Sequence, residues 1–277
     1  MRNKNAQRGN YKKVYLVGAA LLLLALSACG RLDRTLTVAG STSVQPYAEI
    51  LAEAWAHLGG EEIDIQGGGS SAGITAARSG TAEIGMSSRA LKADEDLWSV
   101  EICKDGLAVI VHPANPVANL TLEQVRQIYA QEITHWDTLG GPAHKIHIIA
   151  REEGSGSRDA FAGLVMDGGE ISPRAIVQAS NGAVRQLVSD DPDAIGFISL
   201  GLVEQGEKPV KALSLEGVLA TRENILSGAY TLSRPFLFVA REEPTGPAMD
   251  FIAFILSEEG RRILTAEGLI PRGGDAA

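Results

Sequence analysis

The sequence is poor in residues that form covalent or metal cross-links. Its 277 residues include two cysteines, Cys29 and Cys103, and five histidines. No second type of metal ligand accompanies the histidines at a spacing typical of a metal site. We therefore expect no metal and no cofactor. An internal disulfide would need both cysteines, and the position of Cys29, described below, argues against that use.

Basic residues are also scarce. The chain carries 25 Lys and Arg against 34 Asp and Glu, a net charge of −9. Residues 1–28 contain five basic residues and no acidic one, so their removal would leave 20 against 34, a net charge of −14. Nucleic acid as a partner is excluded, because it would need a basic surface. A small anion can still bind, since exposed charges are screened beyond about 8 Å at physiological salt.

The chain has no apolar run suited to spanning a membrane comfortably. The run over residues 14–28 is shorter than the roughly 20 residues that a span needs and follows a basic start, as in a targeting segment. It ends in Leu26–Cys29, which resembles the bacterial lipobox. The resemblance implies cleavage before Cys29 and attachment of lipid to its sulfur. The alternative is an ordinary cleaved signal with a coincidental cysteine. Lipidation would leave Cys103 without a disulfide partner.

The remaining residues, about 249 in number, are long for one hydrophobic core and sufficient for two lobes. Apolar patterns of strand and helix length alternate along them, which is typical of an α/β architecture with mostly parallel sheets. The predicted strands cover residues 36–39, 63–65, 107–112, 146–150, 194–199 and 235–240. The predicted helices cover residues 46–58, 74–78, 121–130, 158–166, 180–188, 221–226 and 248–267.

One stretch, Arg151–Ser157, has the composition of an anion-binding turn. It lies between a predicted strand and a predicted helix, so its glycines and serines belong to a helix N-terminus. Such a terminus offers unpaired N–H donors and about half a positive charge, and Arg151 can bind an oxyanion through two nitrogens. A glycine-rich loop with a capping serine and a surface arginine is the alternative. The stretch is not a P-loop, because no Gly-Lys-Ser/Thr follows at the required spacing.

Three further strand ends carry serine or threonine in the same way. They lie at residues 40–43, 67–73 and 87–89. Ligands of open α/β sheets bind at the carboxyl ends of strands. Four such turns would therefore surround a tetrahedral anion with N–H and O–H donors. We expect about one in four of these residues to be only a helix cap.

The mature chain resembles, along nearly its full length, the phosphate-binding lipoproteins of the Pst phosphate-uptake ABC transporter, the PstS family. The resemblance rests on Val38–Ser43 with Pro46, Gly69–Gly73, Ile84–Arg89, Leu122–Trp136, Arg151–Ser157 and Ala194–Phe197. It implies an α/β fold of the two-lobe, type II periplasmic-binding-protein kind, with a two-strand hinge and the ligand in the interlobe cleft. The implied limits are a signal peptide (1–28), an anchor linker (29–34), lobe 1 (35–112 plus 236–277) and lobe 2 (113–235).

By the same resemblance, each binding turn contributes named groups to a phosphate ligand. Arg151 would supply the charge, and the remaining groups would donate hydrogen bonds from hydroxyls and helix termini. The implied phosphate-binding residues are Ser41, Thr42, Ser43, Ser70, Ser88, Arg151, Ser155, Gly156 and Ser157.

The family often has an aspartate where this sequence has Ser88. A serine hydroxyl can accept a hydrogen bond from phosphate or donate one to sulfate, so a weaker preference for phosphate over sulfate follows. The alternative is that a carboxylate from elsewhere, such as Glu83, Asp94 or Asp105, fills the role. We expect Arg89 to be a solvent-facing charge or one that supports the site from behind.

The function that the resemblance implies is capture of inorganic phosphate and its delivery to an ABC-type permease, without catalysis. The protein would be a monomer anchored at the extracytoplasmic face of the cell membrane by lipid on Cys29. A binding protein for another oxyanion, such as sulfate or molybdate, and a lipid-anchored phosphate sensor are alternatives. A phosphate-ester hydrolase is disfavoured, because Ser155 and Ser157 have no histidine or acid pair to activate them.

Overall fold

A computed structural model describes residues 35–273 of the chain. Cys29 and the predicted signal segment lie outside the described residues. The strands are β1 (Leu36–Gly40), β2 (Ile63–Gly67), β3 (Ile84–Ser87), β4 (Trp98–Val111), β5 (Asn119–Leu120), β6 (His147–Arg151), β7 (Ile176–Gln178), β8 (Ala194–Ser199), β9 (Lys211–Ala212), β10 (Ser214–Leu215), β11 (Ser233–Ala240) and β12 (Ile270–Pro271). The helices are α2 (Gln45–His57), α3 (Ser70–Ser79), α4 (Leu122–Tyr129), α5 (Gly156–Val165), α6 (Asn181–Asp190), α7 (Arg222–Leu226), α8 (Pro247–Leu256) and α9 (Glu258–Ala266), with 3-10 turns η1 (Trp136–Leu139) and η2 (Leu200–Leu202).

The strands follow the order β2-β1-β3-β11-β4-β8-β6-β7, with β9 and β12 pairing with β4 at the side. The neighbours β2, β1 and β3 are parallel to one another, and so are β8, β6 and β7. By contrast, β11 runs antiparallel to both β3 and β4. This is the predicted α/β class. Among residues 35–273 no helix is long and apolar enough to cross a membrane.

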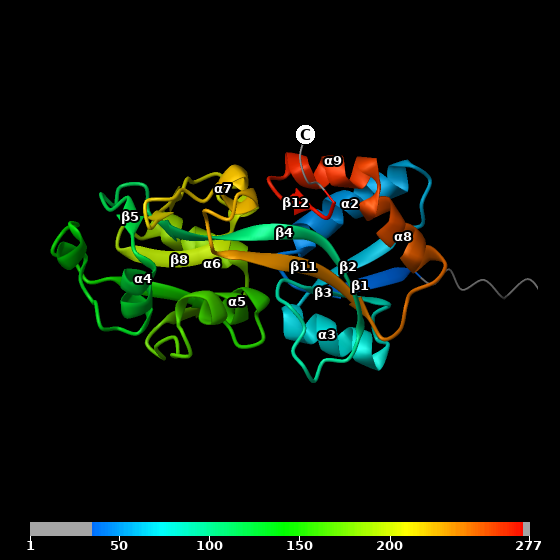
Figure 1. Ribbon diagram of the computed structural model, residues 1–277, viewed down its shortest axis with the longest axis horizontal. Helices are drawn as coiled ribbons and strands as arrows, with labels where there is room; N and C mark the ends of the chain where they lie inside the picture. Colours follow the sequence, from blue (N-terminus) through cyan, green and yellow to red (C-terminus); the bar gives the residue numbers. More distant parts are fainter. Residues whose placement is uncertain (1–34, 274–277) are drawn as a thin grey trace, which may run out of the picture. The chain divides into compact units, whose positions relative to one another are not determined.

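Strand β4 changes partners along its length. Its residues from Trp98 to Gly106 pair with β11, and those from Leu107 to Val111 pair with β8. Figure 1 shows β4 and β11 running together through the middle of the fold. We call the elements before this change the first lobe (β1–β3, β11, β12, α2, α3, α8 and α9) and those after it the second lobe (β5–β10 and α4–α7). Two adjacent strands thus connect the lobes, as in the predicted two-strand hinge.

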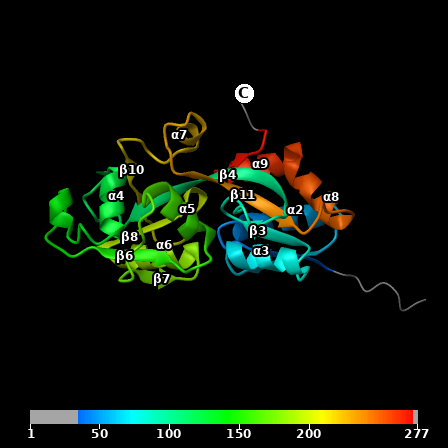
Figure 2. The same ribbon diagram turned by 60° about the horizontal axis from the view of Figure 1, so that its bottom comes forward.

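Helices cover both faces of the sheet in the first lobe. Alternate residues of β11 face opposite sides: Phe236 and Phe238 belong to a core cluster with α2 and α8, whereas Leu237 and Val239 pack with Ile74 of α3. In Figure 2, α3 lies on the opposite side of β3 and β11 from α8 and α9. The second lobe repeats this layering, with α6 on one face and α4 and α5 on the other.

Local sequence signals explain most helix ends. Thr121 caps α4 in a capping box with Gln124, and Ser180 caps α6 by accepting the N–H of Ala183. The single helix predicted over residues 248–267 is wrong. Ser257 adopts an extended conformation (φ −69°, ψ 171°) and caps α9, so the chain forms two helices. The apolar spacing continues across the break, which is why periodicity alone did not reveal it.

Candidate anion-binding site

Four turns meet where the strands of the two lobes end. Ser41–Ser43 follow β1, Ser70 begins α3 after β2, Ser88 follows β3, and Arg151–Ser157 join β6 to α5. Contacts between the lobes hold these turns together: the Ser71 N–H donates to the carbonyl oxygen of Gly154 at 3.0 Å. All nine residues predicted to bind phosphate lie in this region. The convergence follows from parallel strands whose carboxyl ends share one edge of the sheet.

The hydroxyls of Ser43 and Ser157 join the first lobe to the second. Their oxygens are 2.8 Å apart, and both side chains are buried. The Asn181 side chain donates to the Ser43 oxygen at 2.6 Å, and Asn181 in turn accepts the N–H of Ser199. The amide orientation of Asn181 is therefore fixed by the backbone of β8. Ser43 and Ser157 form one rigid pair of hydroxyls.

A second pair is formed by Ser70 and Ser88. Their hydroxyl oxygens are 3.3 Å apart, and Ser70 accepts the N–H of Ser88 at 3.0 Å. Gly156 lies against both, because a Cβ atom at this position would clash with the two hydroxyls. Gly156 therefore lets the N-terminus of α5 approach α3 and the end of β3 closely.

Backbone donors accompany the hydroxyls. Among residues 35–273 the N–H groups of Thr42, Ser70, Gly156 and Ser157 have no hydrogen-bond acceptor. Those of Ser70, Gly156 and Ser157 belong to the first turns of α3 and α5, where the helix macrodipole is positive. Two of the predicted residues also have local roles: Ser155 caps α5 by accepting the N–H of Arg158, and Ser41 accepts the N–H of Ser43.

Arg151 has one nitrogen that no protein group uses. Its side chain is 1% exposed. Nε and Nη2 donate to the two carboxylate oxygens of Glu152 at 2.8 and 2.7 Å, and Nη2 also reaches the Thr42 hydroxyl at 3.1 Å. Nη1 is buried without a hydrogen-bond partner in the described part of the chain. A buried guanidinium N–H is costly unless it is paired, so Nη1 indicates a ligand with acceptor oxygens.

Sequence reasoning missed a second buried arginine next to these turns. Arg234, at the start of β11, donates through Nη1 to the Ser157 hydroxyl at 2.8 Å. Nε and Nη2 donate to Oδ2 of Asp105 at 3.0 and 2.9 Å, and the Ser199 hydroxyl donates to Oδ1 at 2.7 Å. The missed signal was a charged pair, Arg234 and Asp105, at the ends of two apolar strand segments. Without the β4–β11 register, nothing in the sequence indicates that Arg234 and Asp105 are partners.

The carboxylates proposed as alternatives to Ser88 do not serve that role. Asp105 already accepts from Arg234 and Ser199, and burial raises its pKa while the guanidinium beside it opposes that rise. Glu83 is exposed and accepts the N–H of Thr37, and Asp94 is exposed in the loop after β3. Glu152 lies beside the site, and its two oxygens both accept hydrogen bonds from Arg151.

Arg89 is buried rather than solvent-facing. Its guanidinium forms two hydrogen bonds with Glu95, and these bonds lower the pKa of Glu95 to about 2. Nε lies 2.8 Å from Oδ2 of Asp159 on α5 but is not aligned for a hydrogen bond, so this contact is an ion pair. The first of the two expectations for Arg89 is therefore wrong. The second is consistent with its position, because Asp159 lies two residues after Ser157.

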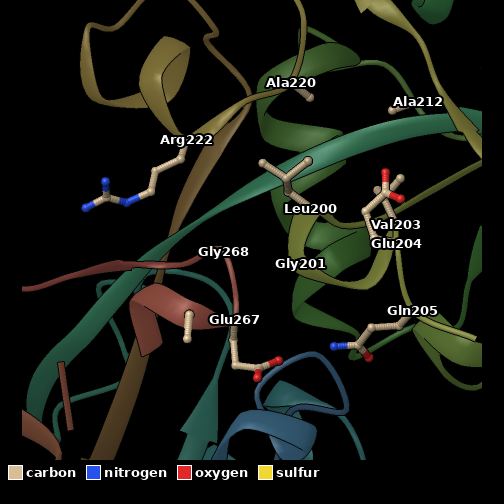
Figure 3. A pocket seen from close by; sticks show the side chains of 11 residues that line it. Leu200, Gly201, Val203, Glu204, Gln205, Ala212, Ala220, Arg222, Glu267 and Gly268 are labelled. Carbon is tan, nitrogen blue, oxygen red and sulfur yellow. The ribbon is translucent and has the colours of Figure 1, made fainter. Parts of the chain in front are cut away.

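A separate pocket of about 470 Å³ contains no predicted site residue (Figure 3). The end of α9 contributes Glu267 and Gly268, and the segment around η2 contributes Leu200 and Glu204. Its wall is largely apolar and carries two carboxylates against one guanidinium, that of Arg222, which does not suit an anion. No three metal-ligating side chains gather anywhere in residues 35–273.

Comparison with known proteins agrees with this geometry. The model of the PBP superfamily domain matches residues 27–259. The phosphate-binding protein PstS of Pseudomonas aeruginosa is 31% identical over 240 residues, covering 76% of this chain and 74% of that protein. The PstS of Bacillus subtilis is 29% identical and covers 86% of this chain and 80% of that protein.

Solved structures give the same result. A protein from Clostridium perfringens, described as a phosphate ABC transporter substrate-binding protein and solved with bound phosphate, has 43% identity and a TM-score of 0.81, covering 86% of this chain and 99% of that one. An ABC-type phosphate transport receptor from Vibrio cholerae has 38% identity and a TM-score of 0.70, covering 85% and 99%. Fold, converging turns and relatives thus agree, and the chain belongs to the PBP superfamily and, within it, to the PstS family of phosphate-binding proteins.

Proposed function

We propose that this chain is the substrate-binding component of a phosphate ABC transporter, which captures inorganic phosphate and presents it to a permease. The observation that carries the proposal is the unpartnered Nη1 of Arg151, buried beside hydroxyls and helix N-termini. A tetrahedral anion offers acceptor oxygens in several directions at once, as such a set of donors requires. The names of the P. aeruginosa and C. perfringens relatives agree with this ligand.

We assign phosphate contacts to the residues of the four turns. Arg151 supplies a charged donor, and the α3 and α5 termini supply backbone N–H groups. Ser41 and Ser155 contribute mainly by shaping their turns, because their oxygens accept local N–H groups. The proposed set is Ser41, Thr42, Ser43, Ser70, Ser88, Arg151, Ser155, Gly156 and Ser157.

A binding role is favoured over hydrolysis. The Ser157 oxygen is paired with Ser43 and Arg234, and the Ser155 oxygen with the N–H of Arg158. Neither serine has an imidazole or carboxylate partner among residues 35–273, so neither has a base to activate it. The relatives named above are binding and transport proteins as well. We expect no turnover of a chromogenic phosphate ester.

The decisive experiment is isothermal titration of the unlipidated mature protein with phosphate, sulfate, molybdate and arsenate. We expect one phosphate per chain and weaker binding of sulfate and molybdate. Preferential binding of sulfate or molybdate would replace phosphate by that anion in the proposal. A sensor role is tested separately, by asking whether a permease co-purifies with the protein.

We further propose that lipid on Cys29 anchors the protein as a monomer to the extracytoplasmic face of the membrane. One acyl chain alone binds membranes marginally, whereas several anchor stably. Wild-type protein should therefore sediment with membranes, and Cys29→Ser should be released or remain unprocessed. Wild-type protein that is entirely soluble after fractionation would contradict the anchor. The predicted lobe limits, 35–112 plus 236–277 and 113–235, stay a prediction.

A further inference from the structure

Arg234 and Asp105 face each other where the two lobes join. They are direct partners in the β4–β11 register, one residue before the β4–β11 pairing ends at Gly106. Both are almost fully buried, with exposed fractions of 3% and 1%. The Arg234 guanidinium also lies 5.3 Å from the ring of Phe236. The Arg234 side chain is thus held in place by both the Asp105 carboxylate and the Phe236 ring.

This ion pair is continuous with the proposed phosphate site. Arg234 uses Nε and Nη2 for Asp105 and extends Nη1 to the Ser157 hydroxyl at 2.8 Å. Ser157 is in turn 2.8 Å from Ser43 of the other lobe. We propose that Arg234, held by Asp105, is a positioning residue of the anion site: it fixes the Ser43–Ser157 pair so that one of its two hydroxyls donates a hydrogen bond to the ligand, and it adds a second positive charge behind the pair. This inference rests on the proposed function.

The direction of the hydroxyl hydrogens follows from counting donors and acceptors. A serine hydroxyl has one hydrogen and accepts two hydrogen bonds. Ser157 accepts from Arg234, and Ser43 accepts from Asn181, and neither of these donors can accept in return. One hydroxyl must therefore donate to the other, which fills the acceptor capacity of the receiving oxygen. The hydrogen of that filled hydroxyl is left to point to a ligand.

In the Ser70–Ser88 pair the directions of the hydroxyl hydrogens are less constrained. Only one external donor, the Ser88 N–H, is directed at it. If Ser88 donates to Ser70, both lone pairs of Ser88 remain free to accept a hydrogen bond from the ligand. The site therefore combines a pair fixed as donor, backed by Arg234, with a pair that can also accept. This division suits an anion that carries both bare and protonated oxygens.

The positive charges of Arg234 and Arg151 also favour an anion at this site. Burial lowers the pKa of Arg234, Asp105 acts against that change, and the nearby charge of Arg151 lowers the pKa further. The two arginines thus repel each other across the site. An anion near Ser157 and the Nη1 of Arg151 relieves that repulsion, because it attracts both guanidinium groups.

The alternative is that Arg234 only neutralises Asp105, a purely structural role. Removing one partner of a buried ion pair strongly destabilises a protein, whereas removing both charges is often neutral. The test therefore compares Arg234→Met with the double variant Arg234→Met/Asp105→Asn, in which neither member of the pair is charged. Thermal unfolding and phosphate titration are measured on each. Arg185→Met is the matched control, because Arg185 is buried and, among residues 35–273, donates only to the carbonyls of Leu202 and Lys208.

We expect Arg234→Met to lower both the melting temperature and the phosphate affinity. In the double variant the melting temperature should largely recover, while phosphate binds roughly 10- to 100-fold more weakly than to wild type, as for loss of a charged hydrogen bond. Arg185→Met should lose stability and keep its affinity. A double variant that binds phosphate within threefold of wild type would reduce Arg234 to a structural role.

Arg234→Lys decides the matter if the double variant does not fold. Its ammonium can pair with Asp105 but cannot reach Ser157 at the same time, so about tenfold weaker binding is expected, and unchanged binding overturns the inference. Wild-type protein in the same titration separates the two proposals. If it does not bind phosphate, the proposed function fails, and the variants are compared on whichever of sulfate, molybdate or arsenate does bind.

Discussion

At the scale of single residues, the two buried arginines of the site differ in how their nitrogens are used. Those of Arg234 are all directed at protein oxygens, whereas Nη1 of Arg151 has no acceptor among the described residues. Arg151 is therefore the arginine that meets the ligand directly. The carboxylate of Glu152 holds the other side of its guanidinium, so the free nitrogen is presented in a fixed direction.

Replacement of Arg151 by alanine should remove most phosphate binding. Loss of a buried charge partner costs on the order of 2–5 kcal/mol, which corresponds to a roughly 30- to several-thousand-fold weaker affinity. Calorimetric titration measures the change. Arg262→Ala on α9 is the control, because Arg262 is exposed and, within the described part of the chain, pairs only with Glu259. Binding by Arg151→Ala within threefold of wild type would place the site elsewhere.

Substitution of Ser88 tests how phosphate is distinguished from sulfate. Near neutral pH phosphate keeps a proton that it can donate, whereas sulfate has none, and a carboxylate acceptor can reject the analogue that lacks the hydrogen by roughly 10⁴–10⁵. We expect wild type to prefer phosphate less strongly than that and Ser88→Asp to widen the preference. Sulfate competition titrations measure both, with Ser88→Ala as the smaller control in this fully buried position.

Wild-type protein that ignores a large excess of sulfate would mean that another acceptor is present. Glu152 is then the first residue to examine, because its carboxylate lies beside Arg151 and faces Gly69 of the other lobe. Glu152→Gln should lose the sulfate rejection in that case.

Residues with a motif around them were predictable from the sequence, and residues without one were not. The glycine–serine turns can be recognised from the local sequence, since close backbone approach and helix capping need those residue types. Arg234 and Asp105 are 129 positions apart and meet only because β11 pairs with β4. Asn181 was predicted at the start of a helix, but its bond to Ser43 depends on the packing of two lobes. Local patterns cannot encode such contacts.

At the scale of elements, ion pairs join α5 to the loop after β3. Asp159 of α5 pairs with Arg89 at 2.8 Å and lies 3.7 Å from Lys92. Arg89 is anchored in its own lobe by Glu95. The contact between Arg89 and Asp159 is therefore one that exists only while the lobes are together, and it bears on how long a ligand stays bound.

Asp159→Asn should weaken phosphate binding about fivefold, mainly through faster release. A partly exposed ion pair contributes up to about 1 kcal/mol, and most changes of affinity within one complex appear in the dissociation rate. Stopped-flow release of phosphate measures the rate. Asp137→Asn, an exposed carboxylate in η1, should release phosphate as wild type does. An unchanged rate in Asp159→Asn would show that this ion pair does not hold the lobes closed.

The limits of helices and strands that are separated by loops were predicted well. The limits were predicted less well where one segment runs directly into the next. The break between α8 and α9 and the early start of β4 at Trp98 were both missed. The apolar spacing continues across the break at Ser257, which hides the break, whereas Lys104, Asp105 and Gly106 interrupt the apolar pattern within β4, which hides its continuity. The alternation of strands and helices was predicted correctly, but the sheet is mixed rather than mostly parallel, because β4 and β11 run antiparallel to their neighbours.

At the scale of the whole molecule, ligand binding should be visible as added stability. Phosphate at 100 times its dissociation constant should stabilise the folded state by about 2.7 kcal/mol. At roughly 2–4 °C for each kcal/mol in a chain of this size, the melting temperature should rise by roughly 5–10 °C. Differential scanning calorimetry with matched chloride as the control measures the shift. A rise of the same size with sulfate would contradict selective binding.

The position of β11 also determines the order in which the chain can fold. β11 lies between β3 and β4, although it follows them by more than a hundred residues. The first sheet therefore has a gap in its middle until nearly the whole polypeptide is available. β1 to β4 can collapse earlier, but the strand that unites them arrives last, after the second lobe has been synthesised. Completion of the N-terminal lobe is thus a late event in folding, and a fragment that ends before Ser233 lacks the central strand of its own first sheet.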